Sequence, residues 1–314
     1  MNHSEMENAV HLGIAFKEAG FQVSQVCCSR PSCFDFAARK DDKTVLIKIY
    51  PDVDAFSQRD SRELRIIAGC VSAAALVIGK KTHDRLLEDD TVYSRYAVYV
   101  VTEKTIKNIA FQTGEPLINA GPGGYFVEVD GSLVEKRRKE MGLSIGKLSE
   151  MIGVSRRTLY GYERSMAKAS VSSAYNLAKV LGVPVAKPVD VLAKTRKQRV
   201  CLLVKARRAL AGQALLNKVF RKFALCDISP VQKAPFDFVM TVPDENCLIV
   251  GGVAANDEEY LDARAEEILS VCRVVHAHPV LITEKREFCS KDVPCVSADQ
   301  LSVMRSPEDL FASS

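Results

Sequence analysis

The chain has 314 residues, of which 47% are hydrophobic and 26% are charged, a globular composition that excludes a wholly disordered protein. The formal net charge of +4 is too small to indicate a nucleic-acid partner by itself. The longest apolar runs, 73–79 and 97–101, are as long as a strand and far shorter than the roughly 18 residues that cross a bilayer. We therefore expect a cytoplasmic protein of two or three domains with no membrane partner.

Helical and strand-like hydrophobic patterns alternate over residues 1–114 and predict an α/β domain. Helices are expected over 5–19 and 57–71, and strands near 21–27, 34–39, 44–50, 75–79 and 97–101. The next segment, 115–130, has two apolar runs around Gly121-Pro122-Gly123-Gly124, which predicts a β-hairpin connector. A strand pattern follows these glycines, whereas a phosphate-binding loop needs a helix there.

Residues 131–192 have a helical pattern throughout and predict a compact all-α domain of five helices. Glycines at 142, 153 and 182 separate the helices, and serines at 144, 155 and 170 are expected as N-caps. Its predicted small core contains the apolar residues Leu143, Leu148, Ile152, Val154, Leu159, Tyr162, Leu177 and Leu181. A basic linker over 193–208 then leads to a second α/β domain over 209–314.

An internal repeat relates the two α/β domains, because Phe34-Asp35-Phe36 recurs 202 residues later as Phe236-Asp237-Phe238. The same offset aligns Leu46 with Leu248, and it aligns Asp60, Arg62 and Cys70 with Asp262, Arg264 and Cys272. A two-residue insertion after Cys272 then aligns 76–78 with 280–282. We expect a duplicated domain; convergence of two similar strand–helix–strand units is the alternative.

The helical segment has the order of a helix-turn-helix, in which Gly153 makes the turn and Ser155 caps a third helix that ends near Arg164. The first residues of such a helix face the major groove, where an arginine can bind guanine or phosphate. The expected DNA contacts are Ser155, Arg156, Arg157, Thr158 and Tyr160 on the third helix, Ser144 and Lys147 on the second, and Lys136 and Arg137 on the first.

This segment resembles the lambda-repressor/Cro (Xre-like) helix-turn-helix family. The resemblance rests on Gly142-Leu143-Ser144, Leu148-Ser149, the run Gly153-Val154-Ser155-Arg156-Arg157-Thr158, Tyr162-Glu163 and a closing Leu177-Ala178 and Leu181-Gly182-Val183. It implies binding to double-stranded DNA and an architectural ion pair between Arg138 and Glu163. A glutamine commonly begins the second helix in this family, whereas this chain has Ser144-Ile145-Gly146.

The order of the whole chain resembles an archaeal family of helix-turn-helix transcriptional regulators. The features are an α/β domain with FDF and LIK, a hairpin with AGPGGYFVEVDG, the helix-turn-helix, and a further α/β part. The resemblance implies a regulator, but it brings no known operator or effector.

Asp35 and Lys48 have the order of half a nuclease site. Restriction-endonuclease-like folds place an Asp on one strand and Glu/Asp-x-Lys on the next, so that two carboxylates bind Mg²⁺. Here Leu46 occupies the acidic position, although a glutamate such as Glu63 could replace it from the helix. In the second copy Asp237 recurs, and the 202-residue offset puts Val250 at the lysine position. We expect two degenerate nuclease-like domains without enzymatic activity, with Asp35 and Lys48 as weak catalytic candidates.

Ten cysteines are scattered along the chain without a CxxC pair, so no metal site and no cofactor are expected. The sequence predicts a sequence-specific transcriptional regulator that binds double-stranded DNA as a homodimer, because one short helix reads too few base pairs. A Mg²⁺-dependent endonuclease targeted by the helix-turn-helix and a protein-interaction module are the alternatives. No residues identify an effector, and a site for one between the repeats is left open.

Overall fold

A computed structural model describes residues 3–83, 85–197, 214–242, 247–254, 260–284 and 292–312. Internal contacts divide the chain into two compact units, of which the first combines Met1–Ile78 with Leu192–Ser314 and the second is Gly79–Val191. Most of the linker expected over 193–208 lies outside the described residues. Among the helices described, none is both long enough and apolar enough to span a membrane.

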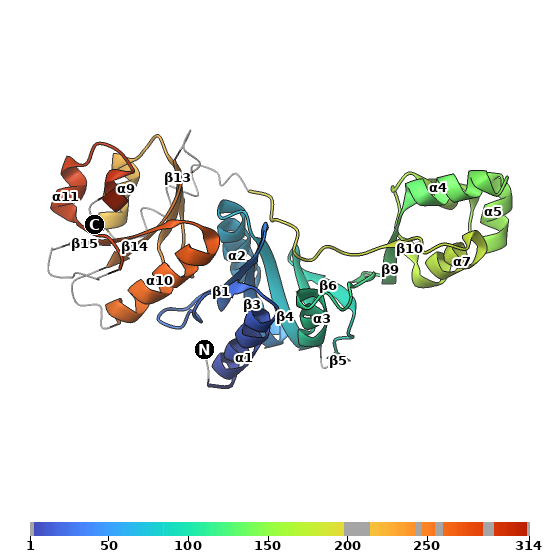
Figure 1. Cartoon of the computed structure of the whole chain (residues 1–314), viewed down its shortest axis with the longest axis horizontal. Coiled ribbons are helices and arrows are strands. Elements are labelled where there is room, and N and C mark those ends of the chain that lie inside the picture. The colour runs from blue at the N-terminus through green and yellow to red at the C-terminus, as the bar shows by residue number, and fades with distance from the viewer. Residues whose placement is uncertain are drawn as a thin grey trace. The chain divides into compact units, whose positions relative to one another are not determined.

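The first half of the first unit is a sheet in the order β1-β2-β3-β4 with the helices α1 and α2 (Figure 1). Its elements are α1 (His3–Glu18), β1 (Gln22–Val23), β2 (Phe36–Lys40), β3 (Lys43–Asp52), a 3-10 turn η1 (Val53–Ala55), α2 (Gln58–Cys70) and β4 (Ala74–Thr82). The ring of Phe16 on α1 packs edge-on against those of Phe21 and Phe36, with centroids 4.9 and 6.0 Å away. This aromatic cluster holds α1 on the sheet.

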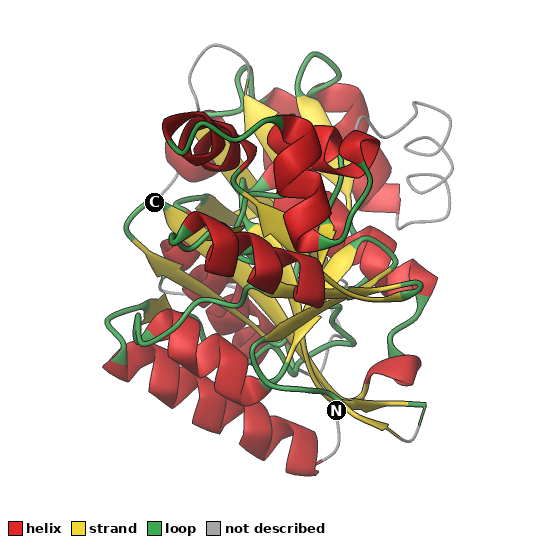
Figure 2. Cartoon of the chain, turned by 90° about the vertical axis from the view of Figure 1, so that its right-hand side faces the viewer, coloured by secondary structure: helices red, strands yellow, loops and turns green. Residues whose placement is uncertain are grey.

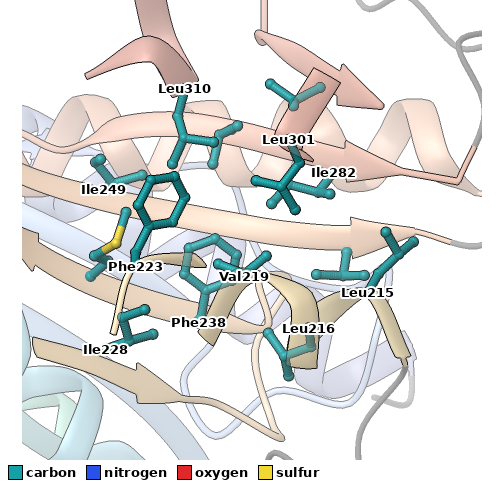
Figure 3. Packing of buried hydrophobic residues seen from close by; sticks show 14 of the residues in the cluster. Leu215, Leu216, Val219, Phe223, Ile228, Phe238, Ile249, Ile282, Leu301 and Leu310 are labelled. Atoms are coloured by element: carbon teal, nitrogen blue, oxygen red, sulfur yellow. The ribbon is translucent and has the colours of Figure 1, made fainter. Parts of the chain in front are cut away.

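The second half of the first unit is a sheet in the order β12-β13-β14-β15-β16, in which β14 and β15 are parallel. Its elements are α9 (Ala214–Lys222), β12 (Asp227–Pro230), β13 (Phe238–Val242), β14 (Cys247–Ala254), α10 (Leu261–Val275), β15 (His278–Thr283), β16 (Cys295–Ser297), α11 (Ala298–Val303) and α12 (Asp309–Ala312). Buried side chains of α9, the sheet, α11 and α12 form one apolar cluster (Figure 3).

The two halves share the order helix, three strands, helix, strand, but the alignment at a constant offset of 202 is wrong after the FDF motif. The Asp35 N–H donates to the Ile47 carbonyl at 2.7 Å, whereas the Asp237 N–H donates to the Gly251 carbonyl at 2.8 Å. Gly251 therefore corresponds to Ile47, and the two-residue insertion lies between β13 and β14. A slip of two residues leaves each side chain on its original face, so the hydrophobic pattern does not reveal it.

The corrected offset of 204 continues through the helix that follows. At the ends of α2 and α10, the Ala73 N–H donates to the Ala68 carbonyl at 2.8 Å and the Ala277 N–H donates to the Cys272 carbonyl at 3.0 Å. By this correspondence Asp60 matches Arg264 and Glu63 matches Glu267.

Within the first unit, the two halves exchange equivalent contacts. Glu267 of α10 accepts a hydrogen bond from the Cys28 N–H at 2.8 Å, and Glu63 of α2 accepts one from the Gln232 N–H at 3.3 Å. The rings of Phe34 and Phe236 lie with their centroids 6.2 Å apart, tilted by 39°. The repeats therefore pack through matching surfaces, and Glu63 is used in this packing.

The second unit contains β5 (Arg85–Leu86), β6 (Thr91–Arg95), β7 (Val98–Val101), α3 (Glu103–Ala110), β8 (Ile118–Gly121) and β9 (Gly124–Val129). The predicted hairpin is confirmed, since β8 and β9 pair antiparallel with Gly121 opposite Gly124. Strand β9 also pairs with two short strands of the helical region, β10 (Ala169–Ser170) and β11 (Ala186–Lys187). Figure 2 shows the strands in yellow and the helices in red.

Candidate nucleic-acid interface

The helical region contains α4 (Gly131–Glu140), α5 (Ile145–Ile152), α6 (Arg156–Glu163) and α7 (Val171–Leu181). Residues 131–192 are all described and form these four helices, whereas five were expected. After Gly182 the chain instead forms β11, in which Ala186 pairs with Val129. Pro184 and Pro188 lie in this stretch, and proline favours extended backbone in the residue before it.

The predicted N-caps are confirmed in three helices. The hydroxyls of Ser144, Ser155 and Ser170 accept hydrogen bonds from backbone N–H groups three residues ahead, at the starts of α5, α6 and α7. The predicted core is also confirmed, because Leu148, Ile152, Leu159, Tyr162, Leu177 and Leu181 are buried together, with Leu143 and Val154 packed against them.

Gly153 forms the turn between α5 and α6. It adopts a left-handed conformation with φ +75°, and a Cβ added to it would have no neighbour within 4 Å. The need for glycine is therefore conformational rather than steric. The turn allows α6 to begin only three residues after it.

Arg138 and Glu163 connect α4 to the last turn of α6. The Arg138 Nε and Nη2 atoms donate to the two carboxylate oxygens of Glu163 at 2.5 and 3.0 Å, and Nη1 donates to the Leu143 carbonyl at 2.9 Å. The hydrogen bonds that Arg138 donates to the Glu163 carboxylate raise the pKa of the Arg138 guanidinium above its usual value. Both side chains are buried, so this paired fork fixes the direction of α6.

The candidate residues on α6 divide into two groups. The Ser155 and Thr158 hydroxyls lie 2.8 Å apart, and Ser155 also caps the helix, so both hydroxyls take part in local structure. Arg156, Arg157 and Tyr160 are exposed. The Tyr160 ring, 48% exposed, lies beneath the Arg164 guanidinium at 5.6 Å.

The candidate residues on α4 and α5 also include both exposed side chains and one that is used in the structure. Lys136 and Lys147 are exposed, and Lys147 pairs with Glu150 at 3.3 Å. Arg137 is half-buried, pairs with Glu140 at 2.7 Å, and donates to the Leu181 carbonyl at 3.3 Å. Arg137 therefore braces α4 against the end of α7, a contact across 44 residues that no local sequence pattern indicates.

In the first repeat, the two residues that resemble half of a nuclease site, Asp35 and Lys48, form an ion pair with each other. Lys48 Nζ lies 2.6 Å from Asp35 Oδ1, and the Ile49 N–H donates to Asp35 Oδ2 at 2.7 Å. Burial raises the pKa of the Asp35 carboxyl, and the nearby Lys48 ammonium opposes that rise. Leu46 is fully buried in the core. Among the described residues, no group of three or more His, Cys, Asp or Glu side chains is placed to hold a metal ion.

The equivalent aspartate of the second repeat also has cationic partners, which corrects the expectation that it had lost its cation. Asp237 Oδ2 accepts from Arg264 Nη2 at 2.5 Å and from the Val253 N–H at 2.6 Å, while Oδ1 pairs with Arg30 at 2.9 Å. The residue that matches Lys48 is Gly252, not Val250. A Cβ on Gly252 would lie 2.9 Å from Ile268 and Leu281 and 3.3 Å from Arg264 Nη2, so these three side chains fill the space beside this glycine.

A cavity of about 340 Å³ lies beside Lys48 in the first unit, and Arg30 and Lys233 also line it. Each of these three cations already has a carboxylate partner, because Lys48 pairs with Asp35, Arg30 with Asp237 and Lys233 with Asp60. The cavity thus lacks the surplus positive charge that a nucleic-acid backbone requires.

Comparison with known proteins identifies two domains. Residues 8–116 match the family model described as “PD-(D/E)XK superfamily domain”, and residues 134–187 match the model described as “Helix-turn-helix”. The helix-turn-helix region is also similar to a solved structure, the crystal structure of SinR, the master regulator for biofilm formation, in complex with DNA. That similarity has 31% identity over 17% of this chain and 88% of the other, with a TM-score of 0.16.

Similarity to archaeal proteins covers most of the chain. Each is named “Putative HTH-type transcriptional regulatory protein”. The protein of Methanosarcina acetivorans is 31% identical over 85% of this chain and 83% of its own length. That of Methanocaldococcus jannaschii is 32% identical over 89% and 87%, and that of Pyrococcus furiosus 29% over 93% and 91%. The chain belongs to this archaeal family of HTH-type transcriptional regulatory proteins.

Proposed function

We propose that this protein is a sequence-specific regulator of transcription that binds double-stranded DNA through α6, as a homodimer, in the cytoplasm. The observation that carries the proposal is the state of the two arginines at the start of α6. Arg156 and Arg157 are exposed next to the Gly153 turn, while the buried pair of Arg138 and Glu163 holds the other end of the helix. A rigid helix with exposed guanidinium groups at its first turn suits contact with DNA in the major groove.

Of the remaining candidate residues, some would contact DNA phosphates and others would stabilise the domain. Lys136 and Lys147 are exposed cations on the neighbouring helices and would contact the phosphate backbone, which sets the register but not the sequence. Ser144 and Ser155 would contribute through the backbone N–H groups that they cap, and Thr158 through its hydroxyl contact with Ser155. Arg137 would contribute mainly to the fold, because its guanidinium is engaged by Glu140 and Leu181.

The small size of the DNA-reading helix supports a homodimer. Helix α6 has eight residues, and a single short helix contacts only a few base pairs. Two copies on half-sites about 10 base pairs apart would multiply the discrimination.

We also propose that the PD-(D/E)XK domain has no metal-dependent nuclease activity. Asp35 is neutralised by Lys48, and Leu46 occupies the position of the second acid. Mg²⁺ requires an octahedral set of oxygen ligands, usually including one or two carboxylates. The nearby helix glutamate, Glu63, instead accepts a hydrogen bond from the second repeat.

Selection from a random pool of duplex DNA tests the proposal. The purified full chain is incubated with the pool without divalent metal, and bound duplexes are amplified and sequenced. We expect one enriched motif composed of two related half-sites. Recovery of random sequence with no enrichment would contradict sequence-specific binding, and an enriched single half-site bound by a monomer would contradict the homodimer alone.

A further inference from the structure

Gly146, in the first turn of α5, lies directly beneath the Arg156 side chain of α6. A Cβ built on Gly146 would lie 3.0 Å from Arg156 Nε, 3.2 Å from Cζ and 3.2 Å from Nη2. Three atoms of the guanidinium group are thus equally close to the missing side chain. The group lies across the bare backbone of α5, which only a glycine permits at this distance.

The backbone gives no other reason for a glycine at this position. Gly146 lies inside α5 and is absent from the glycines with positive φ, unlike Gly142 and Gly153 on either side of the helix. Glycine within a helix is less stable than alanine, because it loses more conformational freedom on folding. The position therefore carries a cost in helix stability while it leaves room for Arg156.

The contact with Gly146 also gives the Arg156 side chain a different direction from that of Arg157. Both arginines are exposed at the start of α6, but the Arg156 guanidinium lies over Gly146 of α5. In this position the guanidinium lies beside α5 and does not extend beyond the end of α6. Arg157 is the next residue along the helix and therefore points in another direction.

We propose that Gly146 is a positioning residue for DNA binding, which holds Arg156 across α5 so that it contacts the phosphate backbone while Arg157 and Tyr160 meet the bases. The inference rests on the proposed DNA-binding function and assigns different tasks to residues within the same site. The loss of a phosphate contact lowers the salt dependence of binding but does not change which DNA sequence is preferred.

The substitution Gly146→Ala separates this role from a structural one. The added methyl group meets the far end of a flexible side chain, so Arg156 moves and the helix does not. We expect a melting temperature equal to or above that of the wild type, together with about fivefold weaker binding to the selected duplex, a loss of roughly 1 kcal/mol. The slope of log affinity against log salt should fall by about 1.

Double variants test whether the effect passes through Arg156. Gly146→Ala should weaken binding no further in an Arg156→Ala background, and it should weaken binding by its full amount in an Arg157→Ala background. Gly13→Ala is the matched control, because Gly13 also lies inside a helix, α1. Its added methyl group would lie 3.7 Å from Val23, which is an ordinary van der Waals distance. It should leave DNA affinity unchanged.

The outcomes distinguish the inference from the function on which it rests. Absence of binding by the wild type would overturn the proposed function itself. Weaker binding by Arg156→Ala with unchanged binding by Gly146→Ala would overturn the inference alone, as would additive losses in the double variant. A changed sequence preference in Arg156→Ala would also overturn it, because Arg156 would then contact bases.

Discussion

Arg264 donates from Nη2 to Asp237 Oδ2 at 2.5 Å, and in the first repeat the ammonium of Lys48 occupies the corresponding place beside Asp35. The lysine comes from strand β3, whereas the arginine comes from helix α10. Each of the two aspartates therefore has a cationic partner, although the cation comes from a different element in each repeat. Both repeats therefore use an ion pair between this aspartate and a cation as part of their structure. A structural role explains why the aspartate and its cation are present even if neither takes part in catalysis.

Replacing Arg264 should strongly destabilise the protein. The side chain is fully buried and also donates to the Pro235 and Val253 carbonyls at 2.6 and 3.1 Å. Arg264→Ala would leave these two carbonyls without their buried donor and would remove one of the two cations that contact Asp237, so we expect the free energy of unfolding to fall by about 3–5 kcal/mol. Urea denaturation measures it. The exposed Arg62 is the matched control, and Arg62→Ala should stay within about 0.5 kcal/mol of the wild type.

The contact between Asp60 and Lys233 should make the packing of the repeats sensitive to acid. Burial raises the pKa of the Asp60 carboxyl, but hydrogen bonds from Lys233 and Ser57 outweigh it, and the net pKa is lowered. An acid with a lowered folded pKa stabilises the fold above its unfolded pKa, about 3.9, and loses this contribution as the pH falls through the folded value. The difference in unfolding free energy between wild type and Lys233→Met should therefore shrink below about pH 4. A difference that grows on acidification would show that the pair does not contribute in this way.

The pair of Arg138 and Glu163 should be costly to break singly and cheaper to replace as a whole. Both side chains are largely buried, at 10% and 3% exposure, so Arg138→Ala leaves an unpaired buried carboxylate and should cost about 3–5 kcal/mol. The double substitution Arg138→Met with Glu163→Leu removes both charges and should recover much of that loss. Hydrogen exchange of α4 and α6 measures both variants. Equal losses in the single and double variants would contradict a paired, buried contact.

The protein should not cleave DNA with Mg²⁺ or Mn²⁺. Supercoiled plasmid incubated with the full chain should remain supercoiled, because Asp35 has an ammonium partner and Leu46 supplies no ligand. Gel electrophoresis detects a single nick per plasmid. Metal-dependent nicking that Lys48→Ala abolishes would establish the endonuclease instead.

Local sequence signals were sufficient for the helix-turn-helix. Serine caps and a glycine turn act within a few residues, so Ser144, Gly153 and Ser155 locate α5 and α6 directly. The end of the helix-turn-helix domain depends on the pairing of strands that are distant in the sequence. Residues after Gly182 form β11 because β9, about 60 residues earlier in the sequence, offers an edge for pairing.

The repeat was visible in the sequence, whereas its alignment was not. Identical FDF motifs reveal the duplication, but the two-residue insertion between β13 and β14 preserves the alternation of buried and exposed positions. The uncorrected offset therefore places the lysine position at Val250 on the strand. A cation for Asp237 instead comes from Arg264, 27 residues away, and only packing brings these two side chains together.

The most direct test of the central claim compares two pairs of charge substitutions in one domain. Fluorescence anisotropy measures the binding of the selected duplex to Arg156→Ala with Arg157→Ala, and to Lys168→Ala with Lys187→Ala. Lys168 and Lys187 are not on α6 and pair with Glu128 and Asp130. The two double variants lose the same charge. We expect the arginine variant to lose at least about a hundredfold in affinity, roughly 3 kcal/mol, and the lysine variant to lose only a few-fold. Equal losses would show that α6 does not read DNA.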